Sequence, residues 1–268
     1  MNVLPNTINE FLLQLKKEFS VEALVDNLSP AISIIHLQGA EVSFVFYRSM
    51  HHTCLHVLMS FPHRRLIHLD EDIYLSKKTI VMARIAAILG RSNRIYARNT
   101  VLARINKKEA TVFQQEHHLQ VFLPGKYRYG LFYKGELVTI AVFSGGRKMH
   151  EYESSYRSFE LLRFCHKSGY LVVGGFSKLI KGFVKAFNPN DIVTYVDRDW
   201  SDGENYHQLG FNNIGIIPSL RFYIHPETGL RYSKKEVQGL SGQLTELEQG
   251  DAYHLVDNLG SIKMRYII

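Results

Sequence analysis

Two adjacent glycines in the second half of the chain mark its clearest candidate for an anion-binding site. Gly174 and Gly175 follow an apolar strand pattern and open onto an amphipathic helix pattern from Phe176 to Phe187. The first amides of a helix lack intrahelical partners, and the helix dipole adds about half a positive charge there. Glycine lets backbone approach a pyrophosphate closely, although the pair would equally serve tight packing of the helix on a sheet. We assign to this candidate site Val172, Val173, Gly174, Gly175, Phe176, Ser177 and Lys178.

The histidines and cysteines do not form a recognisable metal-binding pattern. His51, His52 and His56 lack a further ligand at a clear spacing, so we interpret them as structural or surface residues and expect no metal. Cys165 lies in an apolar run, where a free thiol packs as a small hydrophobic group; a nucleophilic role is the alternative.

Composition limits the function classes. Of the 268 residues, 46% are hydrophobic, which excludes predominant disorder. Two cysteines are too few for a disulfide scaffold. No apolar run approaches the roughly 20 residues of a membrane helix, and the first residues lack a signal-peptide pattern. We therefore expect a cytoplasmic protein without a membrane partner. The net charge of +7 fits either a polyanionic partner, nucleic acid or a phosphorylated cofactor, or merely a basic protein.

Hydrophobic periodicity predicts the elements that position the candidate residues. In the first third we expect a helical start within 7–26, strands at 32–37, 42–47, 51–58 and 65–69, and a helix over 77–89 capped by Ser76. Next come an extended segment at 96–105, a helix opened by an Asn106–Glu109 capping box, a hairpin over 127–143 turning at Lys134-Gly135, and a strand at 159–164. After the glycine-led helix we expect strands at 192–196, 211–217 and 220–224, a short helix at 202–209, and a final strand near 262–267.

This order of elements carries a family resemblance over residues 98–224. The order β–α–ββ–β–(glycine turn)–α–β–α–β, closing in the Tyr-His-Gln-Leu-Gly-Phe sequence of 206–211, resembles the Gcn5-related N-acetyltransferase fold. The resemblance implies an α+β fold with a mixed β-sheet and flanking helices. It also implies that the glycine turn binds the pyrophosphate of an acyl-CoA such as acetyl-CoA. The turn reads Leu-Val-Val-Gly-Gly-Phe where the family has Arg/Gln-x-x-Gly-x-Gly/Ala.

A narrower resemblance rests on several separated motifs in one order. Segments 116–120, 130–133, 160–165, 172–179 and 194–197 resemble the C-terminal module of bacteriophage homing-endonuclease-like proteins, and 231–234 and 253–262 are similar to that family's tail. The Glu-Leu-x-Arg-x-Cys, Ser-Lys-Leu and Thr-Tyr elements are also distantly similar to Mom-type DNA-modification proteins, transferase-fold enzymes that alter adenine in phage DNA. These resemblances imply DNA as a partner.

The resemblances suggest roles for the polar residues near the expected cleft. His118 matches the family's His-Leu-Gln and becomes a candidate general base for an amine; capping of its own helix is the alternative. Asp197 would orient a base or bind an amine, or else cap the following turn. Tyr195 and Tyr206 would protonate a thiolate leaving group; alternatively, they are core aromatic residues whose hydroxyl groups contact water. Arg163 enters as a substrate-binding residue through the family match.

Residues 65–72 and the expected helix up to Gly90 resemble the end of a restriction-type or very-short-patch-repair nuclease. Such a nuclease needs a carboxylate on a core strand to hold Mg²⁺, yet Ala40 to Pro62 contains only Glu41. We therefore divide the chain into a degenerate restriction-endonuclease-like α/β region at 1–97, a transferase domain at 98–224 and a C-terminal extension at 225–268, and we expect no nuclease activity.

Two functions remain open. The first is an N-acyltransferase-like group transferase that uses a CoA-type small molecule and modifies a nucleobase amine in DNA. The alternative is a non-catalytic DNA-binding module in which Lys77-Lys78, residues 91–98 and residues 231–235 contact phosphates. The sequence leaves the donor, the acceptor and the oligomeric state open.

Overall fold

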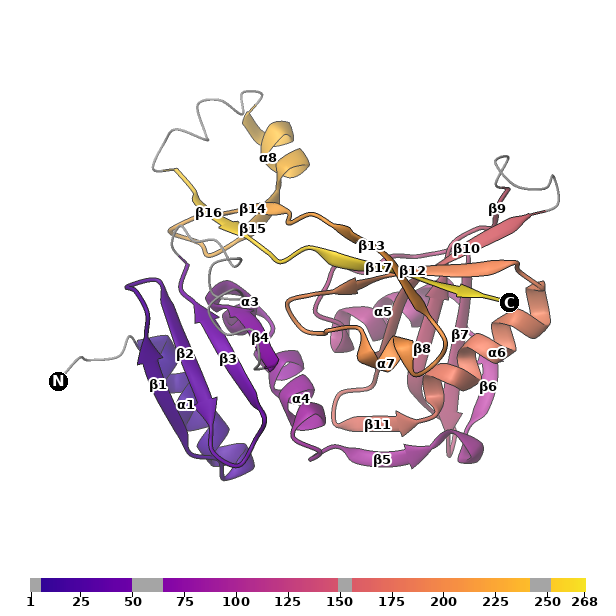
Figure 1. The fold of residues 1–268 in the computed structure, drawn as a ribbon, viewed down its shortest axis with the longest axis horizontal. Coiled ribbons are helices and arrows are strands. Elements are labelled where there is room, and N and C mark those ends of the chain that lie inside the picture. The colour runs from indigo at the N-terminus through magenta and orange to yellow at the C-terminus, as the bar shows by residue number, and fades with distance from the viewer. Residues whose placement is uncertain (1–5, 50–64, 149–155, 242–251) are drawn as a thin grey trace. The chain divides into compact units, whose positions relative to one another are not determined.

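The computed structural model describes residues 6–49, 65–148, 156–241 and 252–268 (Figure 1). Two compact units emerge, and each is discontinuous in sequence. Unit 1 comprises residues 1–78, 197–202 and 217–261, and unit 2 comprises residues 79–196, 203–216 and 262–268. The expected sequential division at 97/98 and 224/225 thus differs from the units, while the nuclease-like origin of residues 1–97 stays a prediction. Among the described helices, none is long and apolar enough to cross a membrane.

Unit 1 contains a sheet in the order β1-β2-β3-β4 with parallel pairing of β3 and β4. Its strands are β1 (Ala23–Asn27), β2 (Ile32–Leu37), β3 (Val42–Tyr47) and β4 (Arg65–Asp70). Helix α1 (Asn6–Phe19) covers one face, because Phe11 packs edge-on against Phe44 and Tyr74. The strands at 32–37, 42–47 and 65–69 are confirmed, and the one expected at 51–58 lies outside the described residues. The helical start is shorter than expected, since Leu24 belongs to β1.

Two helices follow β4 where the sequence predicted one. Helix α3 (Glu71–Ser76) precedes α4 (Lys78–Ile88). Ser76 is the last residue of α3, and its hydroxyl donates to the Asp72 carbonyl instead of capping α4. The later part of unit 1 is a small sheet, β15-β14-β16, with one helix: β14 (Arg221–Ile224), β15 (Arg231–Ser233), α8 (Lys234–Ser241) and β16 (His254–Asp257).

Unit 2 is built on a large mixed sheet. The order among the described strands is β13-β17-β12-β10-β8-β7-β6, with β9 paired to β10. These strands are β6 (Val101–Arg104), β7 (Tyr127–Tyr133), β8 (Glu136–Phe143), β9 (Arg147–Lys148), β10 (Arg157–His166), β12 (Asp191–Asp197), β13 (Asn212–Ile217) and β17 (Ser261–Ile267). Strand β17 thus lies between β12 and β13. The sequence did not predict this position, because β17 is distant from both strands along the chain.

Helices cover both faces of this sheet. Helix α6 (Gly175–Phe187) packs on one face, where Phe183 stacks on Phe143 with ring centroids 3.8 Å apart. Helix α5 (Lys107–His117) covers part of the other face through Ala110 and Phe113. The predicted capping box is confirmed: the Asn106 side chain accepts the Glu109 N–H at 2.9 Å, and Glu109 accepts the Asn106 N–H at 2.9 Å. A four-residue helix, α7 (Glu204–His207), precedes β13.

The hairpin between β7 and β8 also matches the prediction. Lys134 and Gly135 both have positive φ, 49° and 83°, as a two-residue type I′ turn requires. One element was not foreseen: β11 (Tyr170–Val173) pairs in parallel with β5 (Asn93–Tyr96), and a short 3₁₀ turn, η1 (Ala97–Asn99), follows β5. The glycine turn therefore follows a strand outside the large sheet.

Candidate functional site

Strands β10 and β12 run parallel but pair over only part of their length. Their register extends from Ser158↔Asp191 to Leu161↔Thr194, although β10 continues to His166 and β12 to Asp197. A register shift between Leu161 and Arg163 in the pairing with β8 marks where β10 bends away. The connection between the two strands runs through β11 and α6, and Phe176 at the start of α6 packs on Phe164 near the carboxyl end of β10, with ring centroids 4.7 Å apart. Open sheets bind ligands outside the carboxyl ends of such strands.

The glycine turn has two different structural roles. Gly174 is the N-cap of α6 with φ +75°, a left-handed conformation that favours glycine, and it has no side chain to cap the helix. A Cβ on Gly175 would lie 3.0 Å from the Cβ of Val172, so this position is closed by packing. The packing interpretation therefore holds for Gly175, whereas Gly174 leaves the helix end open.

The first intrahelical bond of α6 runs from the Lys178 N–H to the Gly174 carbonyl at 3.0 Å. The amides of Gly175, Phe176 and Ser177 precede this bond and have no acceptor within the helix. Val172 is buried and Phe176 packs on Tyr206, while Val173 is 41% exposed.

The Lys178 ammonium does not extend from the turn toward an anion. It donates to the carbonyl of Ala97 at 2.8 Å and to the carbonyl of Thr100. It therefore holds η1 beside the start of α6.

His118 ends α5 in the manner of a C-cap. Its N–H donates to the Gln114 carbonyl at 2.8 Å, and its Nδ1 accepts the Gln120 N–H at 3.0 Å. Because Nδ1 accepts this bond, the neutral ring carries its proton on Nε2. The capping alternative thus has direct support, and the general-base role stays a prediction.

Arg163 is engaged by backbone carbonyls. Its Nη2 and Nε donate to the Val121 carbonyl at 2.8 and 3.1 Å, and its Nη1 donates to the Leu162 carbonyl at 2.7 Å. These bonds anchor the segment after α5 to β10. The substrate-binding role stays a prediction from the family match.

The two candidate tyrosines lie in different surroundings. Tyr206 belongs to an aromatic group with Phe176 and Phe211, at centroid distances of 5.1 and 5.8 Å. Tyr195 is 44% exposed on the sheet face opposite α6, because its neighbours Thr194 and Val196 are the buried residues of β12. Tyr195 is therefore the more accessible hydroxyl.

Asp197, the last residue of β12, is grouped with unit 1. Its Oδ1 accepts the Asp199 N–H at 3.0 Å, and its carbonyl accepts the Ser201 N–H at 3.0 Å. These bonds match the turn-capping alternative.

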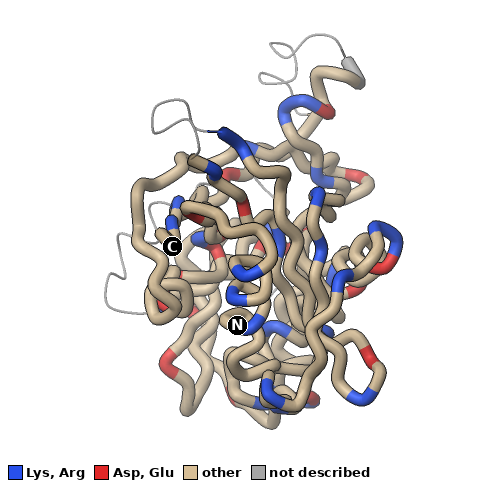
Figure 2. Tube along the Cα trace, turned by 90° about the vertical axis from the view of Figure 1, so that its right-hand side faces the viewer, with Lys and Arg blue, Asp and Glu red and all other residues tan. Residues whose placement is uncertain are grey.

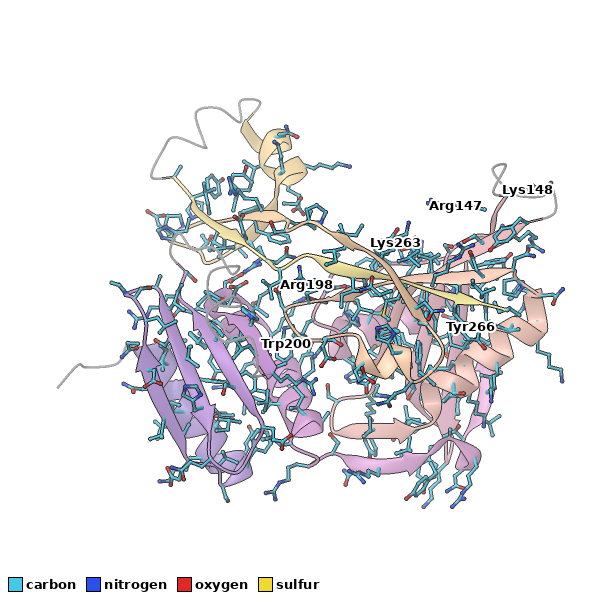
Figure 3. The ribbon with its side chains drawn as sticks, in the orientation of Figure 1. Arg147, Lys148, Arg198, Trp200, Lys263 and Tyr266 are labelled. Carbon is cyan, nitrogen blue, oxygen red and sulfur yellow. The ribbon has the colours of Figure 1, made fainter. Side chains whose placement is uncertain are left out.

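A depression of about 120 Å³ lies on the face of the unit 2 sheet that carries Tyr195. Its lining residues are Ser144, Arg147, Ser158, Phe159, Glu160, Val193, Tyr195 and Lys263. Figure 3 shows Arg147 and Lys263 on their separate strands, β9 and β17. Sequence reasoning found only Tyr195 among these residues. No local signal pointed to Arg147, Glu160 and Lys263, because three different strands bring them together.

Burial shifts the pKa values of two side chains near the end of β10. Burial raises the pKa of the Cys165 thiol to about 12, as expected for a packing role. Burial lowers the pKa of His166 to about 4, and its Nδ1 lies 2.8 Å from the Thr139 hydroxyl. No group of three or more metal-ligating side chains occurs among the described residues, which do not include His51, His52 and His56.

Comparison with known proteins gives structural neighbours only. No protein-family model and no curated protein matches the sequence. The histone acetyltransferase HPA2 and related acetyltransferase of Corynebacterium glutamicum matches with TM-score 0.31 and 14% identity over 53% of this chain and 64% of that one. The Escherichia coli ribosomal-protein-S18-alanine N-acetyltransferase matches with TM-score 0.37 and 13% identity over 63% and 94%. A Gcn5-related family acetyltransferase of Elizabethkingia anophelis, with acetyl-CoA bound, matches with TM-score 0.37 and 11% identity over 63% and 99%.

These superpositions are partial, so the fold is defined by the observed connections. Four strands, β6, β7, β8 and β10, are followed by α6, by β12 parallel to β10, and by β13, in the order that the sequence predicted. Unit 2 therefore has an α+β fold, a mixed β-sheet with flanking helices.

Proposed function

We propose that unit 2 is a group transferase of the N-acyltransferase type whose donor is an acyl-CoA. The observation that carries this proposal is the parting of β10 and β12 at the edge where α6 begins. The amides of Gly175, Phe176 and Ser177 would bind the pyrophosphate, and the parted strands would receive the rest of the donor.

In this reaction an amine nitrogen attacks the thioester carbonyl, a C–N bond forms, and the C–S bond breaks. The amine loses a proton to a base, and the departing thiolate gains one. Tyr195 is the hydroxyl best exposed for the second step, with Tyr206 as the other candidate. His118 or Asp197 would take the amine proton; both are engaged in local hydrogen bonds in this structure. A nucleobase amine in DNA is the acceptor that the Mom-type resemblance implies.

The alternative, a non-catalytic DNA-binding module, loses part of its support. Arg231 donates to Asp70 and Asp72, and Lys78 pairs with Glu10, so these cations are already neutralised within unit 1. Figure 2 shows Lys and Arg scattered over the face in view with Asp and Glu among them. A continuous basic stripe would have favoured phosphate tracking along a duplex.

The test is titration of the protein with CoA and acetyl-CoA by calorimetry, using Ser177→Glu and Ser177→Gln as a matched pair. Ser177 is the third helical residue of α6, where a carboxylate favours the helix but repels a pyrophosphate. We expect Ser177→Glu to weaken CoA binding by about tenfold or more, equivalent to roughly 1.4 kcal/mol, and Ser177→Gln to weaken it less. Gly175→Glu would be a poorer test, because the new side chain would clash with Val172.

Failure of CoA and acetyl-CoA to bind the wild-type protein would overturn the donor assignment. A parallel titration with a short DNA duplex at low and moderate salt addresses the alternative. Duplex binding that fades steeply with salt, without CoA binding, would favour the DNA-binding module, because each neutralised phosphate releases a counterion.

A further inference from the structure

Four polar side chains that line the depression on the unit 2 sheet make no polar contact with other described residues. Arg147, Glu160, Tyr195 and Lys263 line it. Within the described part of the chain, these four side chains form no hydrogen bond and no ion pair, whereas the nearby Ser144 hydroxyl accepts the Glu160 N–H at 2.9 Å. By contrast, Arg265, on the same strand as Lys263, is paired with Asp191. Uncommitted charges that converge on one depression are the pattern of a ligand site.

The arrangement of strands places opposite charges in a fixed order across the depression. Arg147 comes from β9, Glu160 from β10, Tyr195 from β12 and Lys263 from β17. In the sheet these strands neighbour one another in that sequence, about 4.8 Å apart. The strand order therefore places a carboxylate and a phenol in the middle and a cation at each flank, and the two cations are labelled in Figure 3.

The depression also lies at the point where β10 and β12 cease to pair. Glu160 pairs with Val193 near the end of the shared register, and Tyr195 is the first residue of β12 beyond it. The face is the one opposite α6, since Phe159 and Ile192 point into the core under that helix. A thioester lying between the parted strands would reach this face at Glu160 and Tyr195.

We propose that this depression is the acceptor site and that it binds a small molecule or group carrying both a primary amine and an anion. Glu160 and Tyr195 receive the amine by charge and hydrogen bonding, and Lys263 or Arg147 pairs with a carboxylate or phosphate. The role of this site in binding the acceptor rests on the proposed transferase function, whereas the binding of an amine and an anion there does not.

The experiment is a binding titration with defined probes, in the presence and absence of CoA. O-phosphoethanolamine and γ-aminobutyrate combine an amine with a phosphate or a carboxylate, and n-butylamine carries the amine alone. A fourth probe, 2′-deoxyadenosine 5′-monophosphate, carries a nucleobase amine with a phosphate. The variants are Glu160→Gln and Lys263→Met. The control is Lys148→Met, because Lys148 is the exposed neighbour of Arg147 on β9 and does not line the depression.

The proposal expects at least one amine–anion probe to bind saturably and more tightly than n-butylamine. Glu160→Gln and Lys263→Met should each weaken that binding about tenfold, and Lys148→Met by less than about twofold. A preference for O-phosphoethanolamine, γ-aminobutyrate or the nucleotide, with the same dependence on the variants, would support the site and identify the source of its anion.

Absence of binding for all amine–anion probes up to about 10 mM, or equal weakening by all three variants, would overturn the proposal. The CoA titration separates this result from the proposed function. CoA binding without amine binding overturns only the acceptor site. Amine binding without CoA binding leaves the site standing and overturns the transferase.

Discussion

In unit 1 the Arg231 guanidinium lies between two carboxylates, whereas in unit 2 Arg147 and Lys263 border a depression and have no ion-pair partner among the described residues. Arg231 Nε donates to Asp72 Oδ2 at 2.7 Å, Nη2 donates to Asp72 Oδ1 at 2.8 Å, and Nη2 also contacts Asp70. Burial raises the pKa of Asp72 despite the opposing effect of Arg231. Burial opposes the charge on Arg231 as well, but its bonds to Asp72 and the charges of both carboxylates raise its pKa.

The comparison distinguishes charged side chains that stabilise the fold, such as Arg231, from those that we propose bind a ligand, such as Lys263. Removing one member of a buried, paired cluster leaves a desolvated charge without compensation, so such groups become structurally required. Exposed, unpaired groups contribute little to folding, and their convergence therefore points to binding. Stability measurements on matched variants test this distinction directly.

The largest effect should follow from Arg231→Met. Loss of the guanidinium leaves the buried Asp72 carboxylate without its ion-pair partner, which we expect to destabilise unit 1 by about 3–5 kcal/mol. Urea unfolding followed by fluorescence measures this, because Trp200 is the single tryptophan, belongs to unit 1 and is 6% exposed. Arg221→Met is the control: Arg221 pairs with Asp257 but its side chain is 52% exposed, so its removal should cost less than about 1 kcal/mol. Equal losses in both variants would contradict the comparison.

Acidification should act on unit 2 through His166. Burial lowers the pKa of His166 to about 4, so the ring stays neutral in the fold and becomes protonated in the unfolded chain below its ordinary value of 6.5. The unfolded state then binds more protons, and the stability of unit 2 falls as pH decreases from about 6.5 to 4. Labelling of the buried Cys165 thiol in a Cys54→Ser background reports opening of this unit. His166→Asn should flatten the slope, and an unchanged slope would refute this assignment.

Asp199 should give unit 1 the opposite dependence. Burial, with the nearby charge of Asp197, raises the pKa of Asp199 well above 3.8. The folded state therefore binds a proton that the unfolded state has released, and this group's contribution to stability is lost as pH rises through the raised pKa. Asp199→Asn keeps an acceptor for the Leu259 N–H and should stabilise unit 1 at neutral pH, measured by Trp200 fluorescence. The exposed Asp202→Asn is the control and should leave the pH profile unchanged.

A smaller effect is expected at the capping box of α5. Asn106→Ala removes the acceptor for the Glu109 N–H and should cost about 1 kcal/mol. Thermal unfolding followed by Cys165 labelling measures the loss. Asn106→Asp retains an acceptor and should keep nearly all of the stability; a similar loss in both variants would contradict a capping role.

The smallest effect should come from Lys263→Met. Its ammonium has no ion pair among the described residues, so we expect the stability of unit 2 to change by less than about 0.5 kcal/mol while binding at the depression weakens about tenfold. A destabilisation comparable to that of Arg231→Met would show that Lys263 holds the fold, and the two units would then no longer differ.

Local patterns made much of unit 2 predictable. The capping box at Asn106, the turn at Lys134-Gly135 and the helix that begins at the glycine pair depend on residues within a few positions of one another. The same holds for the strand near 262–267, whose alternating pattern is local even though its neighbours in the sheet are not.

The candidate site was less predictable, because its geometry depends on contacts between distant segments. The functional roles suggested for His118, Arg163 and Lys178 treated their side chains as available. In the folded chain their polar atoms bond to Gln120, Val121 and Ala97, respectively. A sequence pattern indicates which groups can donate or accept a hydrogen bond. The backbone carbonyls and amides that lie near each group in the folded chain determine its partner.

By itself, the sequence of this protein determined the type and order of its elements, since propensity, periodicity and capping act over one or two turns of chain. Only the tertiary structure decided that β17 enters the sheet between β12 and β13, that Arg231 meets Asp72, and that Lys263 faces Glu160 across one depression. Those juxtapositions follow from strand register and burial, which are properties of the whole packed chain and leave no mark in any single segment.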